Sequence, residues 1–135
     1  MSEWNDAIIE EFRTNKGKVG GQFADATLLL LHTTGAKSGL ERVNPMVYFM
    51  DGDRYVVIAS KGGADTNPDW FTNLVAHPDV SVEAGTEEFP ATAAVPSEPE
   101  RTQLYEKMES VRPGFTEYKH KTARIIPVVT LTRKS

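Results

Sequence analysis

The first part of the chain spaces its apolar residues as a helix does. The apolar stripe of residues 1–16 comprises Trp4, Ile8, Ile9 and Phe12, and the opposite face is acidic. Three glycines follow and are expected to end this helix, namely Gly17, Gly20 and Gly21. The pattern therefore predicts an N-terminal helix that packs its apolar stripe against the body of the domain.

From residue 27 onward, short apolar segments alternate with glycine- and proline-containing turns, which is typical of β-strands. Six segments are expected to form strands: 27–33, 42–50, 55–60, 80–84, 89–95 and 125–132. Pro45 lies within the second segment and indicates an edge strand or a bulge, because proline cannot donate a hydrogen bond to a neighbouring strand. The first three strands are expected to form a meander, which brings loops 34–39 and 60–67 to the same rim.

Two further helices and a turn are predicted between the later strands. Asn67 as the N-cap and Pro68 as the first helical residue predict the start of one helix. Ser97 and Glu100 have the spacing of a capping box, which predicts the start of another. A short turn at 115–118 then precedes the last strand.

These elements predict an α+β domain with a mainly antiparallel sheet, because hairpin-type connections join about six short strands and the helices are few. Closure of the sheet into a small barrel would remove its exposed edges. A chain of 135 residues with 39% hydrophobic residues is expected to build one core, so residues 1–135 are predicted to form a single domain.

Composition and charge exclude several classes of function. A net charge of −4 argues against a nucleic-acid partner, and the absence of cysteine excludes disulfides, thiolate metal sites and thiol nucleophiles. The longest apolar run, 28–31, is too short to span a bilayer, and the acidic N-terminal segment does not resemble a signal peptide. We therefore expect a cytoplasmic protein without an integral membrane segment. The three histidines lack the spacing of metal ligands, so no metal site is predicted.

Two polar, glycine-containing loops carry the candidate chemistry. The first supplies Lys37 and Ser38, with Arg42 just beyond it. The second precedes a predicted helix N-terminus and supplies Ser60, Lys61, Gly62 and Gly63. Exposed backbone N–H groups, a helix N-terminus and full positive charges together suit a phosphate group. The alternative is that both loops are ordinary hairpin turns with solvated lysines.

Two further pairs of residues are candidates for contacts with a ligand. Trp70 and Asn73 share the first turns of the helix after the second loop, and they form either core packing or a flat wall with a hydrogen-bonding group. Phe115 and Tyr118 are either core residues or, above a cleft, an apolar wall and a phenol that can donate a proton.

Three stretches of the chain resemble, in order and spacing, the signatures of the deazaflavin (F420)-dependent nitroreductase and F420H2-dependent quinone reductase family. They are TTGAKSGLERVNP at 33–45, SKGG at 60–63 followed by NP-x-W-x-x-NL at 67–74, and Tyr118 with RIIPV at 124–128. The likeness extends from about Glu10 to the end of the chain. Each stretch alone is a weak signal, whereas the three together are specific.

The resemblance implies a flavin-reductase-like split β-barrel with reduced coenzyme F420 along the rim described above. It implies that the phosphate and acidic tail of the cofactor are held by Lys37, Ser38 and Arg42. It further implies that the phosphate and ribityl chain are lined by Ser60, Lys61, Gly62 and Gly63, and that the ring system is bordered by Pro45, Trp70 and Asn73.

The same resemblance implies hydride transfer to a planar, electron-poor acceptor, which is a quinone, a nitroaromatic or an activated enone. It makes Tyr118 the candidate catalytic proton donor, within a substrate pocket of Val47, Phe115 and Tyr118. Val47 and Phe115 stand where quinone- and nitro-reducing relatives carry aromatic hydroxyls. Nitroreduction is therefore expected to be weak or absent.

Two alternatives to this function stay open from the sequence. One is a split-barrel oxidoreductase that uses FMN, and the other is a non-catalytic F420 carrier or storage protein. The partners expected are a small-molecule acceptor and a second copy of the chain, because split barrels often pair through their sheets. A quinone acceptor would suggest peripheral membrane association, against which the acidic first helix argues.

Overall fold

The computed structural model describes residues 3–19 and 27–134. Its strands are β1 (Leu28–Thr34), β2 (Glu41–Val47), β3 (Phe49–Asp51), β4 (Arg54–Ile58), β5 (Asp79–Ala84), β6 (Glu87–Ala94) and β7 (Val128–Arg133). Its helices are α1 (Glu3–Thr14), α2 (Asp69–Ala76), α3 (Glu100–Val111) and α4 (Gly114–Lys121), with a 3-10 turn η2 (Lys61–Gly63). Gly20, Gly21 and the side chain of Trp4 lie outside the described part of the chain.

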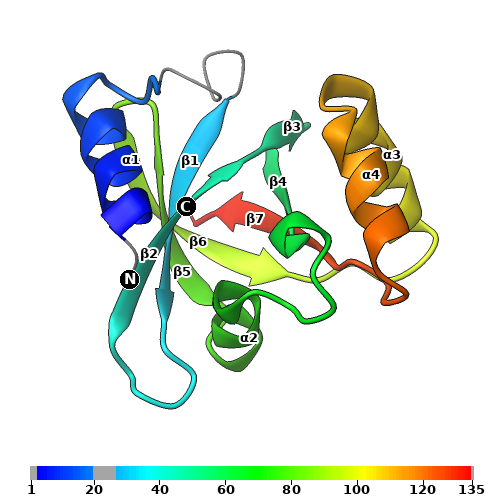
Figure 1. The fold of residues 1–135 in the computed structure, drawn as a ribbon. Helices are drawn as coiled ribbons and strands as arrows, with labels where there is room; N and C mark the ends of the chain where they lie inside the picture. Colours follow the sequence, from blue (N-terminus) through cyan, green and yellow to red (C-terminus); the bar gives the residue numbers. More distant parts are fainter. Residues whose placement is uncertain (1–2, 20–26, 135) are drawn as a thin grey trace.

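One antiparallel sheet contains all seven of these strands, in the order β2-β1-β5-β6-β7-β4-β3. Tyr48 alone joins β2 to β3, although these strands lie at opposite ends of that order. The sheet therefore has to curl until its two ends approach each other, as Figure 1 shows. The predicted α+β class with an antiparallel, partly closed barrel is confirmed.

The break at Tyr48 also changes two predicted details. The expected strand 42–50 divides into β2 and β3, which gives seven strands in place of about six. The expected three-strand meander is interrupted at Tyr48, because β2 pairs with β1 whereas β3, the second part of the expected strand, pairs with β4. The edge position of Pro45 is confirmed, since β2 is the end strand of the sheet.

Strand β1 is buried on both faces, as its continuous apolar run predicts. Leu29 and Leu31 belong to the main core inside the curled sheet, and Leu28 and Leu30 pack against α1 on the outer face. The stripe of α1 that meets them includes Phe12, which is almost fully buried. Burial of a side chain of this size contributes about 1.5–3 kcal/mol, so α1 is held by its apolar stripe.

Helices α3 and α4 cover the other side of the barrel (Figure 1). Their cluster contains Val56 and Ile58 of β4, together with Tyr105 and Met108 of α3. The Tyr105 hydroxyl donates a hydrogen bond of 2.6 Å to the carbonyl of Phe115, which ties α4 to α3. Burial raises the pKa of Tyr105 to about 12, so its phenol keeps this proton at neutral pH.

The predicted cap of α2 is wrong by one residue. The helix begins at Asp69 with Pro68 as its N-cap, and Asn67 lies outside it. The Oδ1 atom of Asn67 instead accepts a hydrogen bond of 2.8 Å from Arg124. A distant partner has therefore replaced the local capping contact that the sequence pattern suggested.

The capping box predicted from Ser97 and Glu100 is also absent from this structure. Pro99 is the N-cap of α3, and the carboxylate of Glu98 just before it accepts hydrogen bonds from the backbone N–H of Thr102 at 3.0 Å and from its hydroxyl at 2.7 Å. The hydrogen bond from the Thr102 hydroxyl is the largest cause that lowers the pKa of Glu98 to about 2, and a hydrogen bond from Arg101 is the next. Glu100 instead accepts a hydrogen bond of 2.9 Å from Arg54.

The turn expected at 115–118 is the helix α4. The last strand begins at Val128, three residues after the predicted start, because Pro127 has no N–H to donate to a ladder. None of the helices in the described part of the chain is long and apolar enough to cross a membrane.

Candidate functional site

The first glycine loop is a tight turn between β1 and β2. The N–H of Gly35 donates to the carbonyl of Leu40 at 2.8 Å, and the N–H of Gly39 donates to the carbonyl of Gly35 at 2.9 Å. Gly39 has a φ of +71°, which favours glycine, and a Cβ at position 35 would lie 2.4 Å from Ser38 Oγ. The glycines of TGAKSG are therefore needed for the shape of this turn.

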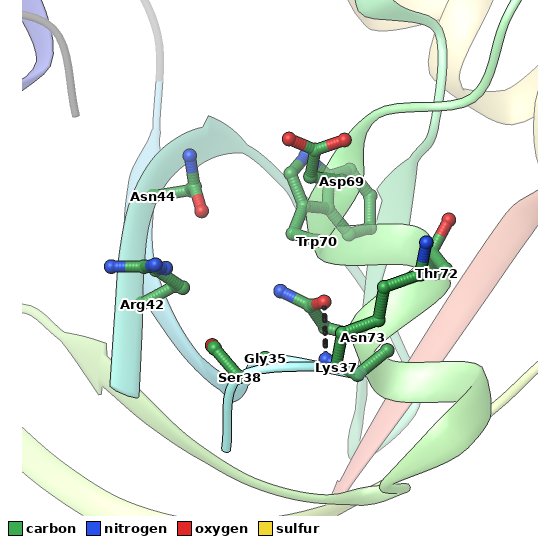
Figure 2. A pocket seen from close by; sticks show the side chains of 10 residues that line it. Gly35, Lys37, Ser38, Arg42, Asn44, Asp69, Trp70, Thr72 and Asn73 are labelled. Atoms are coloured by element: carbon green, nitrogen blue, oxygen red, sulfur yellow. Dashed lines mark hydrogen bonds between the residues drawn. The ribbon is translucent and has the colours of Figure 1, made fainter. Parts of the chain in front are cut away.

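Asn73 ties the turn to helix α2. Its Oδ1 accepts a hydrogen bond of 3.0 Å from the backbone N–H of Ala36 (Figure 2). Its Nδ2 donates one of 3.2 Å to Thr33 Oγ1. The side chain is only 8% exposed. In this structure the amide predicted to border a cofactor ring holds two elements of the site together.

A cavity of about 650 Å³ opens between this turn, β2 and the start of α2. Figure 2 shows Arg42 and Asn44 projecting from β2 and Trp70 from α2 around the same space. The residues that line it are Gly35, Ala36, Lys37, Ser38, Arg42, Asn44, Asp69, Trp70, Thr72 and Asn73. Trp70 is 9% exposed and also belongs to the main core, so it forms a rigid wall.

Two positive charges line this cavity without an internal partner. Lys37 and Arg42 are exposed, and within the described residues neither forms a hydrogen bond or an ion pair. The lining contains one carboxylate, that of Asp69. Since opposite charges in the protein do not neutralise Lys37 and Arg42, the cavity is suited to an anionic ligand.

The second glycine loop has a different environment. The Lys61 ammonium donates a hydrogen bond of 3.2 Å to Thr66 Oγ1 within the same loop. Gly63 has a φ of +87°, and a Cβ there would lie 3.0 Å from the carbonyl oxygen of Tyr118. Glycine at position 63 therefore permits α4 to approach the loop closely.

Arg124 holds this second loop in place. Its guanidinium donates hydrogen bonds to the carbonyls of Ala59, Ser60 and Ala64 at 2.8–3.3 Å, in addition to its bond to Asn67. The sequence reasoning did not include Arg124 among the site residues. The signal available in the sequence was its position at the start of RIIPV, one of the three stretches that resemble the family.

The structure separates the predicted site residues into groups. Lys37, Ser38, Arg42, Trp70 and Asn73 come together around the cavity of 650 Å³, whose lining does not include Pro45 or residues 60–63. Pro45 lies within β2. Residues 60–63 form η2 and its N-cap, and η2 contacts α4.

The three residues predicted for the substrate pocket lie around one apolar cluster. Val47, Phe115 and Tyr118 are all partly buried against it, and the rings of Phe115 and Tyr118 are 5.1 Å apart at their centroids. Val47 also lines a smaller cavity of about 330 Å³ with Tyr48 and neighbouring residues of β3. Tyr118 is not among the residues that line either cavity.

Comparison with known protein families matches residues 4–133 to the F420H(2)-dependent quinone reductase family. This chain belongs to that family. An F420H(2)-dependent quinone reductase of Mycobacterium tuberculosis is 40% identical to it over 134 residues, which cover 96% of this chain and 88% of that protein. The family assignment makes the chain an F420-dependent oxidoreductase.

Solved structures of similar proteins agree with this family assignment. The structure of an F420-H2 dependent reductase has a TM-score of 0.71 and 37% identity, over 77% of this chain and 92% of that one. A second structure, described as a domain-swapped dimer, has a TM-score of 0.74 and 34% identity, over 96% of this chain and 97% of that one. The flavin-reductase-like split barrel is confirmed. The family name specifies F420 as the cofactor, and the comparisons do not support the FMN alternative.

Proposed function

We propose that this protein reduces a quinone with reduced F420, and that the cavity between the first loop and α2 holds the anionic part of this cofactor. The observation that carries the proposal is the pair of unpartnered cations, Lys37 and Arg42, on a cavity with a tryptophan wall. F420 bears a phosphodiester and glutamate carboxylates, and anions of this kind need paired cations when they leave water. The residues present therefore fit the cofactor.

Within this proposal each group of residues has its own task. Lys37, Ser38 and Arg42 bind the phosphate and the acidic tail, and the unpaired backbone N–H groups of the turn add weaker donors. The ring system is bordered by Pro45, Trp70 and Asn73. Ser60, Lys61, Gly62 and Gly63 line the phosphate and ribityl chain. Reduced F420, when bound, supplies the hydride.

The acceptor is proposed to bind on the side of Val47, Phe115 and Tyr118. These residues surround an apolar cluster, which suits a planar quinone better than a charged molecule. Tyr118 is exposed enough to reach a bound acceptor and is proposed to donate a proton to its oxygen. Nitroaromatics and activated enones are weaker candidates, because the family to which the chain belongs is described by quinone reduction.

A homodimer is proposed as the assembly. The support is the similarity to a chain described as a domain-swapped dimer, which extends over 97% of that chain. Size-exclusion chromatography with light scattering measures the mass directly. A mass of one chain, 14.9 kDa, across all concentrations would contradict the dimer.

The experiment that tests the function is a fluorescence titration of the protein with oxidised F420, with FMN in parallel. We expect saturable binding of F420, weaker binding of FMN, and turnover of a small quinone such as menadione by the F420H2-loaded protein. Tyr118→Phe should lower turnover by about a hundredfold and leave F420 affinity unchanged, because it removes only the proton donor.

The same experiment separates the alternatives. F420 binding without turnover across quinones, nitroaromatics and enones would indicate a carrier or storage protein. Preferential FMN binding would move the protein to another split-barrel oxidoreductase, and binding of neither cofactor would overturn the proposal.

A further inference from the structure

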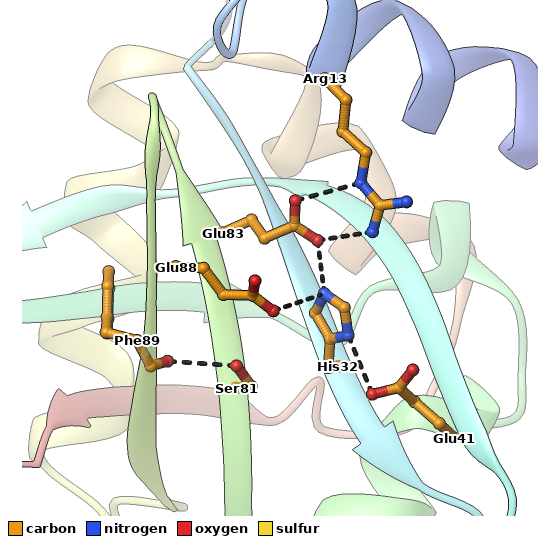
Figure 3. A network of polar contacts seen from close by, with 7 residues as sticks. All are labelled: Arg13, His32, Glu41, Ser81, Glu83, Glu88 and Phe89. Atoms are coloured by element: carbon orange, nitrogen blue, oxygen red, sulfur yellow. Dashed lines mark hydrogen bonds and ion pairs between the residues drawn. The ribbon is translucent and has the colours of Figure 1, made fainter.

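A cluster of titratable side chains lies on the outer face of the sheet, away from the cavity described above. His32 of β1, Glu83 of β5 and Glu88 of β6 come from three neighbouring strands and converge there (Figure 3). The strand register explains the convergence: Leu30 is paired with Glu83, Glu83 with Glu88, and His32 follows Leu30 by two residues on the same face. His32 is only 8% exposed, whereas the side chain of Glu88 is 61% exposed.

The ligand atoms of these three residues have the spacing of a metal site. One atom from each lies within 4.8 Å of the others. His32 Nε2 is 2.5 Å from Glu83 Oε2 and 3.9 Å from Glu88 Oε2. Metal bonds of 2.0–2.2 Å in a tetrahedral arrangement place donor atoms about 3.3 Å apart. An ion can therefore replace the proton shared by His32 and Glu83 after shifts of about an ångström.

A fourth residue, Glu41, orients the imidazole ring of His32. Glu41 Oε2 lies 3.2 Å from His32 Nδ1, on the other side of the ring from Glu83 and Glu88. Metal-bound histidines commonly donate their second ring N–H to a carboxylate, which fixes the tautomer and directs the free nitrogen to the ion. The contact with Glu41 thus directs Nε2 toward the carboxylates of Glu83 and Glu88.

The charges around the imidazole also favour a divalent cation. Glu41, Glu83 and Glu88 face His32 from β2, β5 and β6, and Arg13 of α1 is the cation opposite them. Three carboxylates thus surround the imidazole, against one guanidinium. The side chain of Arg13 is 51% exposed and donates two hydrogen bonds to Glu83, at 3.1 and 2.7 Å.

From this arrangement we infer that His32, Glu83 and Glu88 bind one divalent transition-metal ion per chain. One imidazole and two carboxylates suit Zn²⁺, Mn²⁺ or Co²⁺, whereas Mg²⁺ and Ca²⁺ prefer oxygen ligands alone. The open side at Glu88 leaves a position for water. The site is independent of the proposed function, because the neighbouring Thr33 faces the opposite side of β1 and contacts Asn73.

The test is isothermal titration of metal-stripped full-length protein with ZnCl2, followed by CoCl2, whose absorption spectrum reports the ligands. We expect saturable binding of one ion per chain and a rise in melting temperature. Glu88→Gln should weaken binding at least tenfold, and His32→Ala should abolish it. Glu87→Gln is the matched control, because Glu87 is the adjacent residue and pairs with Arg133 instead.

Arg13→Gln distinguishes a metal site from an ion-pair network. If Arg13 and the metal ion compete for Glu83, this substitution should tighten zinc binding severalfold. Absence of saturable binding, equal weakening by Glu87→Gln, or zinc affinity that survives both Glu88→Gln and His32→Ala would overturn the inference. Glu88 is at the surface, so its variant tests the site even where His32→Ala fails to fold.

Discussion

The two glycine-containing loops of this protein look alike in sequence and differ in structure. The first, at 34–39, presents Lys37 without a partner on a cavity beside α2. The second, at 60–67, has its lysine bonded to Thr66 and its carbonyls bonded to Arg124. The comparison teaches that a lysine in a polar loop indicates an anion site only where the fold leaves its charge unpaired.

The largest effect should come from the second loop. Arg124→Ala leaves the carbonyls of Ala59 and Ala64 without their donor and that of Ser60 with the N–H of Gly63 alone, and the free energy of unfolding should fall by about 3 kcal/mol. Urea unfolding followed by tryptophan fluorescence measures it. Arg133→Ala is the control, since the loss of its exposed ion pair with Glu87 and of its contact with the Phe89 ring should cost only about 1 kcal/mol. Equal losses in the two variants would show that the second loop is not held by Arg124.

The next effect belongs to the first loop and concerns binding. The double variant Lys37→Ala/Arg42→Ala should raise the dissociation constant for F420 about thirtyfold, or about 2 kcal/mol, because two unpaired cations are lost. The free energy of unfolding should stay within about 0.5 kcal/mol. Lys61→Ala should weaken binding less than threefold, since Thr66 already accepts its hydrogen bond. If Lys61→Ala lowered F420 affinity as much as the double variant, the two loops would not differ in their contribution to F420 binding.

Asn73 tests whether the shape of the first loop depends on α2. Asn73→Ala leaves the N–H of Ala36 without its acceptor and should cost about 1–2 kcal/mol in unfolding free energy. It should also weaken F420 binding by displacing the turn. Thr72→Ala is the control, because Thr72 is exposed on the same helix and lines the same cavity. Full stability of Asn73→Ala in the same urea experiment would contradict this dependence.

The smallest effect concerns the backbone of the two lysines. Lys61 has a φ of +49°, a conformation that costs most residues about 1 kcal/mol, so Lys61→Gly should stabilise the protein by about 0.5 kcal/mol. Lys37 is not among the described residues with positive φ, and Lys37→Gly should lower stability by a similar amount. Thermal unfolding of both variants measures the two changes in melting temperature. Changes in the same direction would contradict a difference in backbone conformation between the two lysines.

Much of the fold could be predicted from local pattern. The run at 28–31 predicts a strand buried on both faces, and the stripe of Ile8, Ile9 and Phe12 predicts the packing of α1. The errors occurred where a distant partner displaced a local one. Asn67 binds Arg124 in place of capping α2, and Glu100 binds Arg54 in place of closing a capping box. Arg54 and Arg124 are far from these sites in sequence, so no local motif contains them.

The amino-acid sequence by itself determined most of the element types, the glycine turn and the three stretches that resemble the quinone reductase family. These features depend on residues a few positions apart, where periodicity, glycine and proline act directly. Only the tertiary structure decided which lysine is unpaired, that Asn73 joins α2 to the turn across 37 residues, and that Arg124 reaches Ala59 across 65. It also decided that His32, Glu83 and Glu88 converge. The curl of the sheet brings these groups together, and the cost of burying polar atoms without partners selects their contacts.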